Sequence, residues 1–431
     1  MRIYLETLGC RLNQAEIESL GREAARRGHE VVDAPSAADW AIINTCTVTH
    51  VAARKSRQAI RRLHRINSAV SIAVVGCYGD NAPVQARGLP GVAMVVPNLH
   101  KEQVLDRIGA APLVDDPQRE HAAVLNLPCE RTRAFIKVQD GCENACAYCV
   151  VTLARGPARS VRPETVLATA RQRCAEGANE LVLSGVNIGS YGRDQGPLAT
   201  VPVEEGWTLA RLVRALLDAC DVPRLRLSSI EPWDITPELL ALWRDARLCR
   251  QLHLPIQSGC AATLRRMGRR TTPDALTALV AQARAWAPGL AITTDVMVGF
   301  PGESDGEFES SLAYIADLAP SRLHVFRYSL RPGTAAAAMP GQVPPDVAAR
   351  RSQQMTALGK RLAQSYHEQL VGQEISVLFE SQTPMGITSM WEGLTDTYVR
   401  VRARATIDLA NSLRRVRVTD ADHLGVTGEV L

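Results

Sequence analysis

Apolar and polar positions in the first 111 residues alternate between short apolar runs and longer stretches that carry an apolar stripe. The short runs predict strands at residues 3–7, 40–44, 71–76 and 92–96. Helices are predicted between them, at residues 14–27 and 48–66. Strands that alternate with helices favour βαβ units, so this region is expected to form an open parallel sheet.

The same alternation resumes near residue 132 and continues to about residue 371. Helical stretches at residues 163–176, 208–219, 272–286 and 303–318 separate six apolar runs. Those runs predict strands at residues 134–138, 180–184, 224–228, 251–254, 291–297 and 322–328. Six such units predict a partial (β/α)6 barrel, whose chemistry is expected on the loops at the carboxyl ends of the strands.

A long helical pattern at residues 344–370 leads to a last region with a shorter period. Residues 375–380, 397–402 and 415–419 alternate as strands do and predict a small all-β barrel. The fold class is therefore α/β with a β-barrel at its end. We expect an N-terminal domain at 1–111, a linker rich in proline and acids at 112–131, a central barrel at 132–371 and the small barrel at 372–431.

Composition narrows the setting in which this chain works. With 431 residues, 46% of them hydrophobic, it can bury a sizeable core. No charge-free apolar run is long enough to span a bilayer, and no basic start precedes an apolar segment, so we expect a cytoplasmic protein with no membrane partner. In that reducing compartment, eleven cysteines suggest metal or catalytic roles. The net charge of +4 is only a weak indication of a nucleic-acid partner.

Three cysteines lie at C-x3-C-x2-C spacing directly after the strand predicted at 134–138. They are Cys142, Cys146 and Cys149. Zinc would need a fourth ligand, and no second cysteine pair lies nearby. A four-iron cluster held by three thiolates keeps one iron open to bind and activate a ligand. The spacing therefore predicts a catalytic loop.

This loop resembles the signature of the radical S-adenosylmethionine superfamily, which also has an aromatic residue before the last thiol, here Tyr148. Its flanks, Lys137-Val138-Gln139-Asp140-Gly141 and Ala154-Arg155-Gly156, resemble the methylthiotransferase family and its threonylcarbamoyladenosine tRNA branch. The chain departs from that pattern at Val151-Thr152, where the family usually has Ile-Pro. The departure concerns the stiffness of the loop, because proline fixes the backbone angle.

Three further cysteines follow predicted N-terminal strands: Cys10, Cys46 and Cys77. The carboxyl ends of parallel strands meet at one edge of a sheet, so these thiols could converge. Alternatively they are unrelated buried residues, since unligated cysteine is often buried. The segments Thr7-Leu8-Gly9-Cys10 and Asn44-Thr45-Cys46 resemble the methylthiotransferase N-terminal domain. That resemblance implies that the trio holds a second, auxiliary cluster whose open iron carries the sulfur to be inserted.

Glycine, proline and neutral polar residues cluster in the loops after the central strands. Each cluster could be ordinary turn chemistry. Glycine also lets a backbone approach a ligand closely. The family resemblance implies that these loops, with Tyr148, line the S-adenosylmethionine pocket through Gly185, Asn187, Ser229, Glu231, Gln257, Gly299 and Gly302. The tyrosine that the family usually has after its paired arginines is replaced here by Thr271-Thr272. His253 and His324 lie within strand-like runs and are interpreted as core histidines.

Arginines recur at helical spacing after Cys46 and at strand spacing near the C-terminus. Arg54, Arg57, Arg61 and Arg65 share one helix face, and Arg400 and Arg402 share one strand face. Both patterns are also typical of solvated surfaces. The last region resembles the TRAM domain, a small RNA-binding barrel, so we expect both groups to contact RNA phosphates.

The resemblance implies an enzyme that uses two 4Fe-4S clusters and S-adenosylmethionine. It would insert a methylthio group at C2 of N6-threonylcarbamoyladenosine at position 37, next to the anticodon of tRNA. Alternative acceptors are isopentenyladenosine tRNA and an aspartate of a ribosomal protein. An alternative of another class is a noncatalytic RNA-binding iron-sulfur protein. Expected partners are the tRNA anticodon arm, a reductant such as flavodoxin or ferredoxin, and a sulfur source, with the enzyme acting as a monomer.

Overall fold

The computed structural model describes residues 1–109, 132–194, 206–385 and 388–431. The chain divides into two compact units. The first comprises residues 1–130, 140–144 and 149–159, and the second comprises residues 131–139, 145–148 and 160–431. Each unit has hydrophobic cores of its own. The linker predicted at 112–131 lies outside the described residues.

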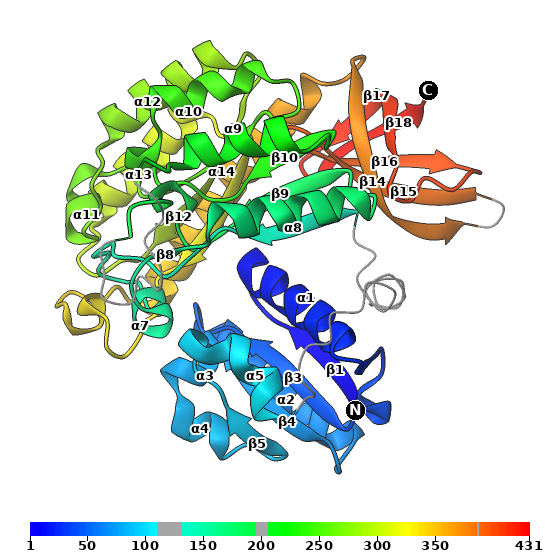
Figure 1. Cartoon of the computed structure of the whole chain (residues 1–431). Coiled ribbons are helices and arrows are strands. Elements are labelled where there is room, and N and C mark those ends of the chain that lie inside the picture. Colours follow the sequence, from blue (N-terminus) through cyan, green and yellow to red (C-terminus); the bar gives the residue numbers. More distant parts are fainter. Residues whose placement is uncertain (110–131, 195–205, 386–387) are drawn as a thin grey trace. The chain divides into compact units, whose positions relative to one another are not determined.

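The first unit is built on a parallel sheet of five strands in the order β2-β1-β3-β4-β5 (Figure 1). The strands are β1 Arg2–Thr7, β2 Glu30–Val32, β3 Trp40–Thr45, β4 Ser71–Gly76 and β5 Val92–Val95. The helices are α1 Arg11–Arg26, η1 Pro35–Ala37, α2 His50–Ile66, α3 Cys77–Asn81, α4 Pro83–Arg87, η2 Asn98–Gln103, α5 Val104–Arg107 and α7 Val151–Arg155. The parallel α/β prediction is confirmed. Strand β2 was not predicted, because its three residues form too short a run to show a period.

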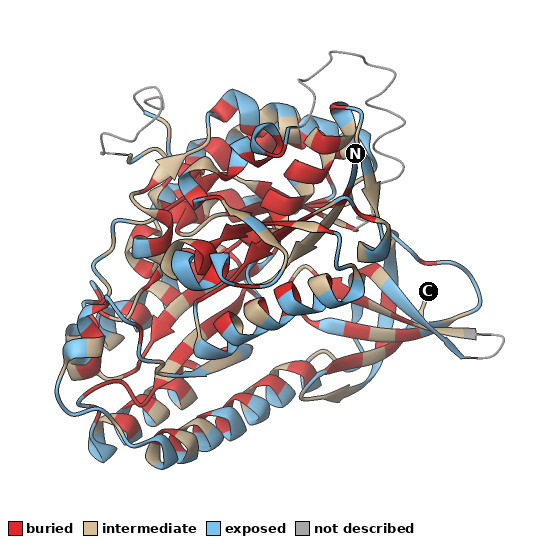
Figure 2. Ribbon diagram, turned by 90° about the horizontal axis from the view of Figure 1, so that it is seen from below, coloured by how far each residue is buried: buried red, intermediate tan, exposed pale blue. Residues whose placement is uncertain are grey.

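Helix α2 illustrates how the sequence fixes these elements. The Thr49 side chain accepts a hydrogen bond from the Ala52 amide at 3.1 Å and so caps the first turn. Ser56, Ile60 and Leu63 recur at steps of three and four and are buried. The opposite face carries the arginines. Figure 2 shows the same division, with buried residues concentrated on the strands and on one side of the helices.

The second unit begins with six parallel strands that form the partial barrel. They make two three-stranded sheets, β10-β9-β6 and β11-β12-β13, which parallel bridges at Leu225–Leu248 and Ser229–His253 join. The strands are β6 Arg133–Lys137, β9 Glu180–Ser184, β10 Arg224–Leu227, β11 Gln251–Gln257, β12 Ala291–Val298 and β13 Arg322–Arg327, and a short pair is formed by β7 Gln139–Asp140 and β8 Arg159–Ser160. The predicted (β/α)6 architecture is confirmed.

Helices connect the barrel strands, as Figure 1 shows. They are α8 Pro163–Ala175, η3 Ile188–Ser190, α9 Leu209–Ala219, η4 Pro232–Asp234, α10 Pro237–Ala241, η5 Leu242–Arg244, α11 Ala261–Arg266, α12 Pro273–Trp286, α13 Asp305–Leu318, η6 Ala335–Ala338 and α14 Pro345–Glu368. Ser304 and Glu307 form a reciprocal capping box at the start of α13. None of the described helices combines the length and apolar character needed to cross a membrane.

The C-terminal strands close into a barrel in the order β14-β15-β16-β18-β17. They are β14 Glu374–Met385, β15 Thr388–Thr395, β16 Arg400–Ala405, β17 Leu413–Asp422 and β18 Gly425–Val430. The predicted small β-barrel is confirmed, with β15 and β18 added to the three predicted strands. Val377, Phe379 and Trp391 are among the apolar side chains that fill it.

Buried arginines attach the C-terminal barrel to the central strands within the second unit. Arg224 donates to the carbonyl oxygens of Leu394 (2.8 Å) and Ser376 (2.7 Å). Arg226 donates to those of Asp396 (2.9 Å) and Thr395 (3.0 Å), and its side chain forms a fully buried ion pair with Glu180 at 2.6 Å. An unpaired buried guanidinium would be costly, so these bonds make the attachment specific.

Candidate functional site

The three N-terminal cysteines converge at the carboxyl edge of the parallel sheet. Cys10 follows β1, Cys46 follows β3 and Cys77 follows β4. The strand order changes direction between β1 and β3, which is where open α/β sheets bind ligands. Electrostatic interaction among the three sulfurs contributes to the pKa values of Cys46 and Cys77, so the thiols are close neighbours. The convergence expected from the sequence is therefore present.

Glycines let the loops approach one another at this edge. Gly9 has a φ of +104°, and a Cβ there would lie 2.9 Å from the Cys46 sulfur. Gly76 has a φ of +89°, and a Cβ there would lie 2.3 Å from Oδ1 of Asn44. Neither position accepts a larger side chain without rearrangement.

The thiols differ in their exposure. Cys10 is exposed, whereas Cys46 and Cys77 are 6% and 4% exposed. Burial raises the pKa of the Cys46 thiol to about 11, and burial also raises that of Cys77. Two of the three groups thus form thiolates readily only when a cation binds them.

Asn13 ties two of these loops together. Its amide nitrogen donates to the carbonyl oxygens of Leu8, at 2.7 Å, and Thr45, at 3.1 Å. These carbonyls belong to the segments that carry Cys10 and Cys46. Asn44 donates in return to the Asn13 carbonyl oxygen at 3.0 Å. The spacing of the first two thiols therefore depends on a buried asparagine pair.

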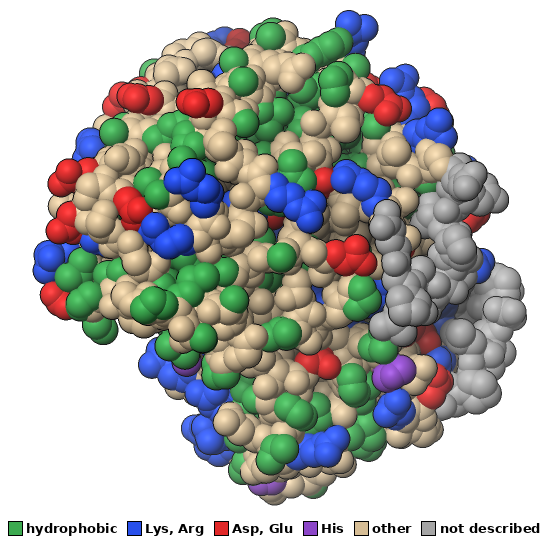
Figure 3. Space-filling model, turned by 90° about the vertical axis from the view of Figure 1, so that its left-hand side faces the viewer, with side chains coloured by type: hydrophobic (Ala, Val, Ile, Leu, Met, Phe, Trp, Pro, Cys, Tyr) green, Lys and Arg blue, Asp and Glu red, His purple; other side chains and the backbone are tan. Residues whose placement is uncertain are grey.

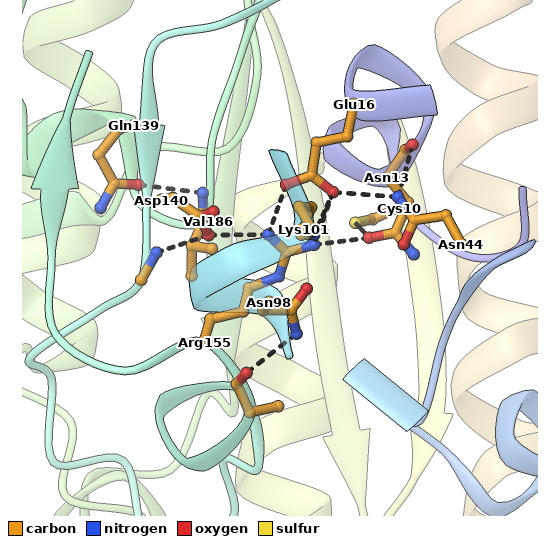
Figure 4. Close-up of polar contacts among 12 residues, drawn as sticks. Cys10, Asn13, Glu16, Asn44, Asn98, Lys101, Gln139, Asp140, Arg155 and Val186 are labelled. Atoms are coloured by element: carbon orange, nitrogen blue, oxygen red, sulfur yellow. Dashed lines mark hydrogen bonds and ion pairs between the residues drawn. The ribbon is translucent and has the colours of Figure 1, made fainter. Parts of the chain in front are cut away.

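Arg155 is the centre of a buried polar network in the same unit (Figure 4). Its side chain is 1% exposed and donates to Glu16 (3.0 Å), Asp140 (2.7 Å) and Asn13 (2.6 Å). Lys101 donates to Glu16 at 2.6 Å. Arg155 and Lys101 thus face two carboxylates, and Arg159 lies 3.7 Å from Asp140, so the buried acids are compensated by cations. Burial opposes the charged form of Arg155, but Glu16 and Asp140 raise its pKa well above the ordinary value.

Sequence reasoning did not assign roles to the members of this network. Asp140 and Arg155 appeared there only as parts of the family-like segments. Glu16 and Lys101 carry no motif, and their burial is visible only in the fold. The one available signal was that Glu16 occupies the apolar face of α1, where an acid needs a partner.

The loop cysteines are Cys142, Cys146 and Cys149, and all three are partly exposed. Cys142 and Cys149 belong to the first unit and Cys146 to the second. The Cys142 amide donates to the Gly156 carbonyl oxygen at 3.1 Å, and its sulfur accepts from the Asn144 amide at 3.4 Å. Gly141, with a φ of +69°, leaves no room for a Cβ beside the Pro157 carbonyl. The first half of the loop is thus fixed by residues 156 and 157.

Arg269 lies beside the middle thiol in the second unit. Its Nη1 is 3.8 Å from the Cys146 sulfur, and the guanidinium donates to both carboxylate oxygens of Glu231 at 2.9 and 2.6 Å. The Trp233 ring lies 4.6 Å below the guanidinium carbon. Glu231, expected in the cofactor pocket, is thus bound to an arginine that contacts the loop.

Tyr148 packs against the loop that follows β12. Its ring meets Phe300 edge-on with centroids 6.4 Å apart, and Phe300 meets Tyr328 in the same way at 5.6 Å. The expected pocket residues Gly299 and Gly302 flank Phe300 and have φ values of +74° and +76°. The Gly299 amide donates to Glu303, which Arg351 of α14 binds at 2.8 Å. These contacts bring Tyr148 and the glycine loop together.

The loop after β9 carries a buried polar atom without a partner. Gln139 accepts from the amides of Val186 (3.0 Å) and Asn187 (2.9 Å), as Figure 4 shows in part. The Asn187 side chain is 5% exposed and donates to Asp234 at 2.9 Å, yet its Oδ1 has no hydrogen-bond donor among the residues that the structure describes. Buried acceptors are normally satisfied, which makes this atom unusual among the described buried side chains. Gly185 leads into this turn, and a Cβ there would lie 2.9 Å from the Gln139 carbonyl oxygen.

Gln257 and Ser229 also lie at strand ends in the second unit. Gln257 ends β11, is 9% exposed and has a φ of +72°, which is strained for a residue with a side chain. Ser229 is partly exposed and bridges to His253 of β11. Both follow their strands at the edge where barrel enzymes carry their chemistry.

The arginines of α2 differ in their exposure. Arg54, Arg61 and Arg65 are exposed, whereas Arg57 stacks over the Tyr78 ring at 5.8 Å. On the face drawn in Figure 3, basic side chains are interspersed with acidic and apolar ones. In the C-terminal barrel, Arg400 pairs with Glu392 (3.1 Å) and Arg402 with Asp422 (2.7 Å). Of the six expected RNA contacts, the three exposed arginines of α2 are the best placed to meet a phosphate.

The two departures from the family pattern have structural roles. Thr152 lies in α7, where its hydroxyl donates to the Cys149 carbonyl oxygen at 3.4 Å. Thr272 caps α12 by accepting from the Ala275 amide at 3.2 Å. At both positions the threonine hydroxyl forms a hydrogen bond with the backbone.

Comparison with known proteins agrees with this geometry. Residues 2–96 match the family described as "Uncharacterized protein family UPF0004", and residues 136–315 match the "Radical SAM superfamily". The chain is similar to the threonylcarbamoyladenosine tRNA methylthiotransferase MtaB of Bacillus subtilis, at 35% identity over 98% of this chain and 94% of that protein. The Thermotoga maritima protein of the same name is 34% identical over 92% and 90%. A tRNA-2-methylthio-N(6)-dimethylallyladenosine synthase from Moorella thermoacetica is 32% identical over 99% and 97%.

Among solved structures, the fold is similar to that of the radical S-adenosylmethionine methyltransferase TsrM from Kitasatospora setae. The TM-score is 0.54 at 15% identity, with 78% of this chain and 77% of that chain covered. At this identity the likeness concerns the fold alone. The full-length similarity to the curated enzymes is decisive: the chain belongs to the methylthiotransferase family of radical S-adenosylmethionine enzymes.

Proposed function

We propose that this enzyme installs a methylthio group at C2 of N6-threonylcarbamoyladenosine at position 37 of tRNA. One observation carries the choice of base: similarity over nearly the whole chain to four enzymes named for threonylcarbamoyladenosine, at 31–35% identity. Enzymes named for dimethylallyladenosine are also similar, at 29–32%. Dimethylallyladenosine tRNA is therefore the second candidate substrate.

The family's cofactors are S-adenosylmethionine and two 4Fe-4S clusters. In this chain we assign one cluster to Cys142, Cys146 and Cys149, and the auxiliary cluster to Cys10, Cys46 and Cys77. The N-terminal trio fits such a group for two reasons. Its three thiols are close together, with Cys10 exposed and Cys46 and Cys77 buried. The two buried thiols need a cation to become thiolates. The loop trio fits because the Cys142 sulfur accepts an amide hydrogen bond, as cluster sulfurs do.

The pocket for S-adenosylmethionine is assigned to the loops after β9, β10, β11 and β12. The unpartnered Oδ1 of Asn187 supports this assignment, because the ligand offers amine and hydroxyl donors. When bound, the reduced cluster and S-adenosylmethionine supply the radical that attacks an aromatic C-H bond, which no side chain could do. The role of the protein groups is placement. Arg269 fixes the loop at Cys146, and Phe300 holds Tyr148 beside the glycine loop.

Contacts with tRNA are assigned to Arg54, Arg61 and Arg65 on α2, with Arg400 and Arg402 in the C-terminal barrel. The exposure of the α2 arginines supports this. A reductant is required by the chemistry, and flavodoxin or ferredoxin fits that role. A sulfur source must recharge the auxiliary cluster between turnovers. We place the enzyme in the cytoplasm with its tRNA substrate and expect it to act as a monomer.

The test is nucleoside analysis of tRNA from a strain that lacks the gene. Loss of 2-methylthio-N6-threonylcarbamoyladenosine, with its unmodified precursor accumulating, is the expected result. The dimethylallyl derivative should be unchanged. Complementation should succeed with the wild type and fail with Cys46→Ala. If the methylthio-dimethylallyl nucleoside were lost instead, dimethylallyladenosine tRNA would be the substrate.

A further inference from the structure

Three neighbouring strands of the central barrel present a histidine, an aspartate and a histidine on one face. Parallel pairing places His253 of β11 opposite Thr293 of β12, and Asp295 opposite His324 of β13. Thr293 and Asp295 are two residues apart, so their side chains leave β12 on the same side. The three polar groups therefore lie side by side on one face of the sheet, at neighbouring register positions.

The ligand atoms of this triad are close together. Nε2 of His253 lies 3.3 Å from one carboxylate oxygen of Asp295, and Nδ1 of His324 lies 3.1 Å from the other. One ligand atom from each residue can be chosen so that all three lie within 4.8 Å of one another. Two ligands about 2.1 Å from one transition-metal ion are about 3.0–3.4 Å apart at octahedral or tetrahedral angles. The two nitrogen–oxygen separations lie in that range, each to its own oxygen of the Asp295 carboxylate.

A hydrogen bond orients the first histidine for this role. Nδ1 of His253 lies 2.9 Å from Oγ1 of Thr293, which also accepts from the Gln251 amide at 2.7 Å. With Nε2 donating to Asp295, Nδ1 accepts from the Thr293 hydroxyl; an ion bound at Nε2 requires the other tautomer, in which Nδ1 donates to Thr293. Ligating histidines usually donate their second ring nitrogen to such a partner.

The site is accessible to a hydrated ion. The side chain of His324 is 39% exposed and those of Asp295 and His253 are 25% and 14% exposed. His324 and Thr293 line a cavity of about 500 Å³ within the second unit. Of the three proposed ligands only His324 lines this cavity, and an ion held by three protein ligands keeps coordination positions open to water or to a further ligand.

We propose that His253, Asp295 and His324 bind a divalent first-row transition metal ion. Two imidazoles and one carboxylate with open positions are a donor set that suits Fe²⁺, Mn²⁺ or Zn²⁺. Without an ion, the same residues would be a hydrogen-bonded triad in which the histidines donate to Asp295. In both states the carboxylate stays ionised. Although burial raises the pKa of Asp295, hydrogen bonds from His253 and His324 lower it below the ordinary value. The two states differ in whether the triad takes up metal.

The test is Mn²⁺ binding by the anaerobic, cluster-loaded enzyme, followed by the loss of the electron paramagnetic resonance signal of free Mn²⁺. Mn²⁺ prefers oxygen and nitrogen donors, so thiols elsewhere in the chain interfere little. We expect Asp295→Asn, which preserves the shape of the side chain, to bind one ion fewer per chain than the wild type. Thr293→Val should keep the site but weaken it about tenfold, because it removes the hydrogen bond that orients His253.

Asp317→Asn is the matched control, because it removes an exposed carboxylate from α13 of the same unit. It should bind as many ions as the wild type. Circular dichroism and iron content should be equal in all variants, which separates metal loss from misfolding. A wild type that binds no more Mn²⁺ than Asp295→Asn, with Zn²⁺ uptake measured by mass spectrometry also equal, would overturn the proposal. The triad would then be a hydrogen-bonded group only.

Discussion

The two cysteine trios offer the same three sulfur donors, but different features of the chain bring each trio together. Cys142, Cys146 and Cys149 lie within eight consecutive residues of one loop. Cys10, Cys46 and Cys77 are spread over 68 residues and meet only because β1, β3 and β4 are parallel neighbours. The first trio depends on local backbone turns. The second depends on the fold of a whole sheet and on the buried network of Arg155. A change in the core should therefore disturb the second trio far more than the first.

The largest expected effect comes from removing one thiol of each trio. Cys46→Ala should halve the iron content, from about eight to about four atoms per chain, and abolish methylthiolation. It should leave reductive cleavage of S-adenosylmethionine intact. Cys146→Ala should also halve the iron content but abolish both activities. Iron and sulfide analysis with an S-adenosylmethionine cleavage assay separates the two, and loss of both clusters in Cys46→Ala would show that the trios are not independent.

The next largest effect, a loss of stability, is expected from Arg155→Met. It leaves Glu16 and Asp140 buried with less compensation, and breaking a buried pair costs about 3–5 kcal/mol. For a unit of this size the melting temperature should fall by about 6–20 °C. Arg2→Met, which breaks an exposed pair with Asp39 in the same unit, is the control and should melt like the wild type. Equal melting of both variants would refute the importance assigned to the network.

Asn187→Ala should act on the cofactor and leave the N-terminal trio alone. Removing one buried acceptor should weaken S-adenosylmethionine binding about tenfold, since a hydrogen bond to a charged group contributes roughly 1.5 kcal/mol or more. Equilibrium dialysis with labelled S-adenosylmethionine measures this. Thr169→Ala, on α8 of the same unit, is the control. Unchanged affinity would remove Asn187 from the pocket.

The smallest effect is expected on tRNA binding. Reversing the charge of Arg54 and Arg61 together should weaken binding several-fold at low salt and reduce the salt dependence by about two counterions. Iron content should not change. Arg26→Glu, on the exposed side of α1, is the matched control. Filter binding at several salt concentrations gives the answer, and parallel curves for the double variant and the control would exclude α2 as an RNA contact.

The sequence predicted the fold where a period or a spacing was present. The βα alternation gave nearly all strands, and the loop trio was visible as a local motif. Strand β2 has too few residues to show a period, and β15 and β18 form only through barrel closure. The Arg155 network could not be predicted, because Glu16, Lys101 and Asp140 are distant in sequence and meet only in the core. For the same reason, His253 and His324 were interpreted as core residues, although they share the Asp295 carboxylate.

The attachment of the C-terminal barrel determines where this protein can be cut. In a chain shortened before β14, Arg224 and Arg226 would lose the carbonyl oxygens to which they donate. The part of β10 that carries them would then be exposed to solvent. Glu180 would then have to hold two guanidinium groups alone. A truncated catalytic fragment is therefore a poor choice for expression, because the C-terminal barrel covers the buried arginines of β10.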